Sequence, residues 1–70
     1  MKQREVIRKI AQQARASGLS WTLARHGANH DVYDLDGLMV PIPRHAEVTN
    51  RFAVIVWREC EPKLGKDWWK

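Results

Sequence analysis

The sequence has little of what several classes of protein depend on, and cysteine is the first shortage. Its single cysteine, Cys60, cannot form a disulfide within the chain, which is typical of a reducing compartment. No apolar run approaches the ~20 residues that a membrane-spanning helix needs. Residues 1–4 lead into an amphipathic pattern and not into the apolar stretch of a signal peptide, so we expect a cytoplasmic protein.

Closely spaced pairs of metal ligands are also missing. Zinc sites usually show such pairs of cysteine or histidine in the sequence. Here the candidate ligands are His26, His30, His45 and Cys60, which lack the two closely spaced pairs of a typical zinc site. We therefore expect neither a metal site nor another cofactor.

Acidic residues are scarce in the first 30 positions. Those positions carry six basic residues against the one acidic residue Glu5, and a short acidic patch follows at Asp31, Asp34 and Asp36. The net charge of the chain is +4. A positive half in so small a protein favours a polyanionic partner, with nucleic acid as the first candidate. A basic surface that binds no ligand would give the same composition, so charge alone decides nothing.

What is present suffices for one small domain. The chain has 70 residues, of which 44% are hydrophobic, enough for a compact core. Helical spacing of apolar residues predicts a helix over residues 4–16, which ends at Ser17 and Gly18. Thr49 is placed to cap a second helix over residues 50–60, which Pro62 interrupts.

Alternating apolar residues predict three strands between these helices, over residues 19–25, 31–35 and 38–42. Asp36 and Gly37 form a strong hairpin signal between the second and third strands. The expected fold class is therefore α+β, with the order helix, three-stranded antiparallel sheet, helix, and with both helices on one face of the sheet.

Four tryptophans are many for a core of this size. Trp21 shares strand parity with Leu19 and Leu23 and is expected in the core. The second helix should bury an apolar stripe of Phe52, Ile55, Val56 and Cys60, to which Trp57 would belong if it does not lie at an interface. Residues 62–70 form a Trp-rich C-terminal extension, in which we expect Trp68 to fold back over the second helix. Trp57 and Trp69 are expected at an exposed protein interface.

Two short motifs are the most informative part of the chain. The first is the turn Gly27-Ala28-Asn29-His30, and the second is the strand end Val40-Pro41-Ile42-Pro43-Arg44-His45. Together with the basic first helix, they resemble the HicA toxins of bacterial type II toxin–antitoxin systems over about residues 2–60. These toxins are small mRNA interferases with a double-stranded-RNA-binding-domain-like fold. The chain departs from their pattern at its C-terminal end and at Ala28, which is often serine in the family.

The resemblance implies that His30 is the catalytic residue, with Gly27 and Asn29 supporting its turn. The chemistry agrees, because an imidazole titrates with an unperturbed pKa of ~6.5 and can take or give a proton near neutrality. Arg44 could clamp a phosphate, or it could pair with Glu47 or with an aspartate of the sheet. His45 is either a phosphate contact or a structural hydrogen-bonding residue. The remaining RNA contacts are predicted at Lys2, Arg4, Arg8, Lys9 and Arg25.

The resemblance also implies an activity and a partner. We expect a metal-independent endoribonuclease that cleaves mRNA and is neutralised by a HicB-like antitoxin. A module of the same fold that binds RNA without cleaving it remains an alternative, because recognition of RNA shape needs no catalytic residue. A protein–protein adaptor that uses the tryptophan-rich end is a third possibility.

Overall fold

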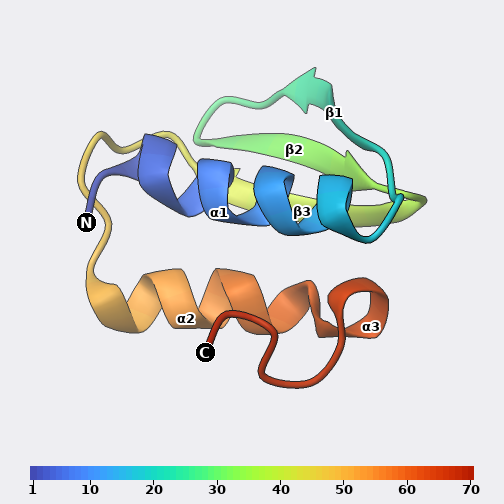
Figure 1. Ribbon diagram of the computed structural model, residues 1–70. Coiled ribbons are helices and arrows are strands. Elements are labelled where there is room, and N and C mark those ends of the chain that lie inside the picture. Colours follow the sequence, from blue (N-terminus) through green and yellow to red (C-terminus); the bar gives the residue numbers. More distant parts are fainter.

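The computed structural model describes all of residues 1–70. Its elements are α1 (Gln3–Ala16), β1 (Trp21–His26), β2 (His30–Leu35), β3 (Leu38–Pro43), α2 (Asn50–Glu59) and α3 (Glu61–Leu64) (Figure 1). This order confirms the predicted α+β fold of a helix, a three-stranded antiparallel sheet and a helix. The short α3 is an addition that follows α2 almost without a break.

The sheet is a meander in which β2 lies between β1 and β3 and is antiparallel to both. The β2–β3 hairpin turns at Asp36 and Gly37, whose φ angles are 49° and 98°. A two-residue hairpin needs such left-handed conformations, so the sequence signal is confirmed. The pairing of β1 with β2 is irregular between Leu23 and Arg25, and such a bulge changes the direction of the strand end.

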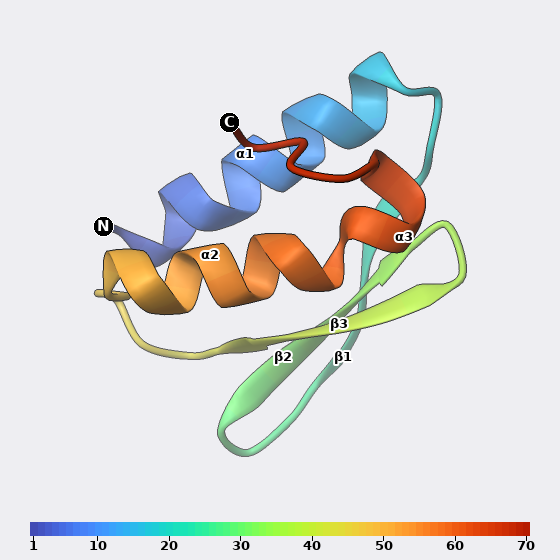
Figure 2. The ribbon, with the colours of Figure 1, turned by 90° about the horizontal axis from the view of Figure 1, so that it is seen from below.

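Both long helices cover the same face of the sheet (Figure 2). The first helix contributes a fully buried row at i, i+4 spacing, consisting of Val6, Ile10 and Ala14. The sheet contributes Leu35, Val40 and Ile42, which are also fully buried. One hydrophobic cluster joins these side chains to those of α2 and to the C-terminal segment. None of the helices is both long and apolar enough to cross a membrane.

The second helix begins as the sequence predicts, because the Thr49 hydroxyl accepts a hydrogen bond of 3.1 Å from the backbone N–H of Phe52. Its buried face is different from the predicted stripe. The buried residues lie at i, i+3, i+4 and i+7, and they are Ala53, Val56, Trp57 and Cys60. Phe52 and Ile55 lie at the flank of this face and are 38% and 47% exposed. The prediction that these two residues are buried is therefore wrong.

The C-terminal segment returns over the helices and is part of the core (Figure 2). The chain reverses at Gly65 and Asp67, which have φ angles of 97° and 56°. Trp57 and Trp69 are only 6% and 9% exposed, so their predicted role as an exposed interface is wrong. The expected return of Trp68 is confirmed, since its indole N–H donates a hydrogen bond of 2.7 Å to the carbonyl oxygen of Trp57.

Trp21 lies at the edge of the core and is half-buried. Its ring stacks on that of Tyr33 with 4.6 Å between the centroids and 4° between the planes. Leu23 continues the same side of β1 and is 42% exposed, although strand parity predicted that it would be buried. Burial on this side of β1 therefore decreases from Trp21 toward Leu23. The prediction that both residues belong to the core is confirmed only in part, for Trp21.

Candidate active site

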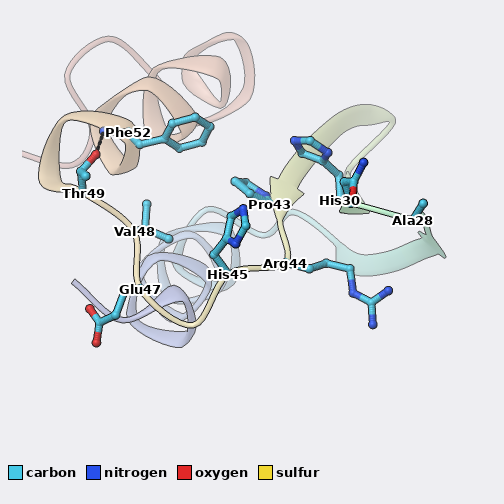
Figure 3. Close-up of a pocket in the computed structure, with 10 residues that line it drawn as sticks. Ala28, His30, Pro43, Arg44, His45, Glu47, Val48, Thr49 and Phe52 are labelled. Atoms are coloured by element: carbon cyan, nitrogen blue, oxygen red, sulfur yellow. Dashed lines mark hydrogen bonds between the residues drawn. The ribbon is translucent and has the colours of Figure 1, made fainter.

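A pocket of about 440 Å³ lies beside the end of β3, where the chain leaves the sheet and approaches α2. Its walls come from the turn before β2, from the loop of residues 44–49 and from the first turn of α2 (Figure 3). Four of the predicted site residues line this pocket, namely Asn29, His30, Arg44 and His45. The structure thus brings together the two motifs that the sequence separates.

The glycine turn is closed by backbone hydrogen bonds. The N–H of Gly27 donates to the carbonyl oxygen of His30 at 2.7 Å, and the N–H of Arg44 donates to the carbonyl oxygen of Asn29 at 3.0 Å. A Cβ atom at position 27 would collide with that same carbonyl oxygen of His30. Glycine is therefore needed here for close approach of the backbone, and Gly27 and Asn29 support His30 through main-chain atoms.

His30 opens β2, and its exposed side chain faces the pocket (Figure 3). Neighbouring strand residues project to opposite sides, so Asp31 points away from the His30 ring. The Asp31 carboxylate is instead hydrogen-bonded to Nδ1 of His26 at 2.8 Å. The hydrogen bonds and ion pairs of the protein involve the ring of His26 but not the rings of His30 and His45. Both pocket imidazoles are therefore free to contact a ligand.

Arg44 is held by the turn that it adjoins. Its Nη1 donates to the carbonyl oxygen of Gly27 at 3.1 Å, and its Nε lies 3.5 Å from Oδ1 of Asp31. The predicted alternative of an ion pair with an aspartate of the sheet is confirmed, whereas Glu47 is not the partner. In Figure 3 the guanidinium extends along the turn and away from His45. A guanidinium carries five N–H donors, so the contacts with Gly27 and Asp31 leave donors for a phosphate.

His45 stands in the loop of residues 44–49 and is exposed. Its ring and that of His30 lie on either side of Pro43, which is buried (Figure 3). Pro43 pairs with His30 in the β2–β3 ladder and precedes His45 by two positions. The fixed φ of Pro43 restricts the path of the chain between β3 and His45.

The loop that carries His45 is anchored to the N-terminus of the chain. The backbone N–H of Gln3 donates to the carbonyl oxygen of Ala46 at 2.9 Å, and its side-chain amide donates to that of Pro43 at 2.9 Å. Nζ of Lys2 lies 2.6 Å from Oε1 of Glu47. This hydrogen bond raises the pKa of Lys2 and lowers the pKa of Glu47. The start of α1 thus holds one wall of the pocket in place.

The five basic residues predicted to contact phosphates are dispersed. Lys2 and Arg4 line a second, smaller hollow next to Ala46. Nζ of Lys9 lies 5.1 Å from the ring centroid of Trp57, in a cation–π contact. Arg8 and Arg25 are exposed, but they line neither hollow. The structure therefore places only Lys2 and Arg4 near the loop that forms the pocket wall.

Sequence reasoning missed Phe52, which forms an aromatic wall of the pocket. The amphipathic pattern of α2 assigned this side chain to the core. A signal was available, because Phe52 is the third residue after the cap Thr49 and the first helical turn follows the Pro-Arg-His motif closely. The pocket thus combines an exposed aromatic ring with two imidazoles and a guanidinium.

No group of three or more histidine, cysteine, aspartate or glutamate side chains is placed to hold a metal ion. Cys60 is fully buried and donates to the carbonyl oxygen of Val56. Burial, with a smaller contribution from the charge of Glu59, raises the pKa of its thiol to about 12. Cys60 is therefore a core residue without nucleophilic character near neutral pH.

Comparison with known proteins identifies no relative. No protein-family model, curated protein or solved structure matches the chain. The pocket that contains His30, Arg44, His45 and Phe52 is therefore the feature of the structure that bears most directly on function.

Proposed function

We propose that this protein is a HicA-like endoribonuclease that cleaves mRNA, and that the pocket of His30 is its active site. One observation carries the proposal: His30, Arg44 and His45 line the same hollow although two sequence motifs supply them. An imidazole can move a proton near neutral pH, and a guanidinium can hold a phosphate. These are the groups that cleavage of an RNA phosphodiester requires.

The reaction uses the nucleophile that RNA itself provides. His30 removes the proton of a 2′-hydroxyl, and the 2′-oxygen attacks the adjacent phosphorus. The bond from phosphorus to the 5′-oxygen breaks, which leaves a 2′,3′-cyclic phosphate and a 5′-hydroxyl. General acid–base catalysis of this kind contributes about 10²–10⁴-fold to the rate. We propose that the reaction is metal-independent, so that cleavage should persist in the presence of EDTA.

The phosphate would be held by Arg44 once its exposed guanidinium, which contacts Gly27 and Asp31, turns toward the pocket. Guanidinium donors directed at the phosphate stabilise the charge that develops in the transition state. The hollow at Lys2 and Arg4 is a second positive region, along which the sugar–phosphate backbone of the RNA could continue. Lys2 contributes less net charge there because it is paired with Glu47.

The pocket favours an unpaired nucleotide as the substrate. Duplex RNA is recognised mainly by shape across its minor groove, whereas unpaired bases stack on aromatic side chains. The ring of Phe52 is 38% exposed and lies in the same pocket as the two imidazoles. A base stacked on Phe52 would place its ribose near His30.

We further propose that a HicB-like antitoxin neutralises the protein by covering the mouth of this pocket. Because Trp57 and Trp69 are buried, we assign the contact with such a partner to the exposed side chains of Phe52, which lines the pocket, and Ile55 on α2. A partner seated on these side chains would also close access to His30. Co-expression with the product of an adjoining reading frame should then restore growth, and Ile55→Glu should weaken that rescue.

The direct test is induction of wild type, His30→Ala and His26→Ala in growing cells, with mRNA integrity followed by hybridisation. His26 is the matched control, because it is an exposed histidine that does not line the pocket. Wild type and His26→Ala should arrest growth and fragment messages, and His30→Ala should do neither. If messages stay intact with every variant while the purified protein binds RNA, the non-catalytic RNA-binding module is the correct function.

A further inference from the structure

Cleavage by the 2′-hydroxyl needs two proton transfers, and His30 accounts for only one of them. A base must remove the 2′-hydroxyl proton, and an acid must protonate the 5′-oxygen as it leaves. The pocket contains a second imidazole, that of His45, on the other side of Pro43 from His30 (Figure 3). The ring of His45 makes no hydrogen bond or ion pair within the protein. In this it differs from the ring of His26, which is paired with Asp31.

The other charged side chains of the pocket are poorly suited to the role of acid. Arg44 does not release its proton in proteins, and it is tied to Gly27 and Asp31. Glu47 is paired with Lys2 and with the N-terminal amine, at 2.6 Å and 3.6 Å. These partners lower the pKa of Glu47, so it remains a carboxylate near neutral pH and has no proton to give.

The uncharged polar residues of the pocket are excluded by their chemistry. The hydroxyl of Thr49 is occupied as the cap of α2, where it accepts from the N–H of Phe52. The amide of Asn29 does not titrate near neutral pH. An imidazole can serve as a general acid, so His45 is the one remaining side chain of the pocket suited to that role.

We propose that His45 is a second catalytic residue, which acts as the general acid for the leaving 5′-oxygen. The inference rests on the proposed ribonuclease function. In the cleavage step His30 takes the 2′-hydroxyl proton, the 2′-oxygen bonds to phosphorus, and the bond to the 5′-oxygen breaks. The His45 imidazolium transfers its proton to that oxygen. His30 then holds one additional proton and His45 one fewer, and exchange with water restores both.

The test compares two RNAs of identical sequence. A cleavage site in a short single-stranded RNA is first mapped with the wild-type protein. The same RNA is then made with sulfur in place of the bridging 5′-oxygen at that linkage. A thiolate leaves without a proton, so the sulfur substrate does not need the general acid. Wild type, His30→Ala, His45→Ala and the control His26→Ala are assayed on both RNAs.

We expect His45→Ala to cleave the oxygen substrate at least ~100-fold more slowly than wild type, in line with the usual contribution of a general acid. It should cleave the sulfur substrate within about tenfold of the wild-type rate. His30→Ala should be impaired on both RNAs, and His26→Ala on neither. The wild-type rate should show a bell-shaped dependence on pH, and His45→Ala should lose the alkaline limb of that profile.

Three results would overturn the assignment. In the first, His45→Ala cleaves the oxygen substrate as fast as wild type. In the second, it is impaired equally on both RNAs, which would indicate a binding role. In the third, the sulfur substrate rescues His30→Ala instead. If the wild type cleaves neither RNA, the proposed ribonuclease function itself fails, and this outcome is distinct from the other three.

Discussion

Replacement of Gly27 by alanine should disable the site through the backbone alone. Gly27 does not need a left-handed conformation, so the cost of Gly27→Ala comes from the collision of the new Cβ with the carbonyl oxygen of His30. To relieve it, the turn must open and weaken two hydrogen bonds. One is the 2.7 Å bond from the Gly27 N–H to His30, and the other is the 3.1 Å bond from Arg44 to the Gly27 carbonyl oxygen.

Forced overpacking costs about 1–3 kcal/mol of unfolding free energy. For a domain of this size, each 1 kcal/mol lowers the Tm by roughly 4–8 °C. Gly18→Ala is the control, because Gly18 has a φ of 72° and no atom within 4 Å of its added Cβ. It should cost about 1–2 kcal/mol through the left-handed backbone and leave the pocket intact. Thermal unfolding followed by circular dichroism gives both stabilities.

The two glycine variants should therefore separate stability from activity. With both proteins folded at the assay temperature, Gly18→Ala should cleave RNA at the wild-type rate, whereas Gly27→Ala should lose at least ~10-fold, because small misplacements of catalytic groups are costly. Wild-type stability and activity in Gly27→Ala would refute the role assigned to the turn.

Four further predictions concern other parts of the molecule. Phe52→Ala should raise the KM for single-stranded RNA by about 5–150-fold, which corresponds to the loss of one base stacked on an aromatic ring, and Phe52→Tyr should leave the KM unchanged. A KM of Phe52→Ala equal to that of the wild type would exclude stacking. Trp69→Ala should lose about 3–5 kcal/mol of unfolding free energy in urea titration, because the indole is buried, and a loss below ~1 kcal/mol would contradict the packing of the C-terminal segment. Cys60, whose thiol pKa is raised to about 12, should resist iodoacetamide at pH ~8 until the protein is unfolded, and rapid labelling of the native protein would contradict its burial. The lowered pKa of Glu47 means that its contribution to stability is present above the unfolded pKa of ~4.3 and is lost as the pH falls through the lowered value. Wild type should therefore lose more stability than Glu47→Gln on acidification below pH ~5. If the urea midpoints of the two proteins decreased equally with pH, the Lys2–Glu47 pairing would be contradicted.

Local signals predicted the framework because each of them acts within a few residues. The Asp36-Gly37 hairpin, the left-handed Gly18 and the Thr49 cap are all as expected. The predictions that failed concern contacts between segments that are distant in the sequence. The burial of Trp69 depends on a chain reversal at Gly65 and Asp67 that no periodic pattern reveals.

The sequence predicted the two motifs of the site but not the contacts between their side chains. The sequence places His30 at the start of one predicted strand and His45 shortly after the end of the next. The pairing of Asp31 with His26 required the register of β1 against β2, which shifts at a bulge between Leu23 and Arg25. Helical periodicity could not distinguish Phe52 as a pocket wall from a core residue.

The most direct test of the central claim is cleavage of an RNA that carries one 2′-deoxyribose at a mapped cleavage site. The purified wild-type protein is incubated with this RNA and with the all-ribose RNA, and the product ends are identified by mass spectrometry. The account predicts cleavage of the all-ribose RNA to a 2′,3′-cyclic phosphate and a 5′-hydroxyl, and no cleavage at the deoxy linkage. Equal cleavage of both RNAs would contradict attack by the 2′-hydroxyl and the proton transfer assigned to His30.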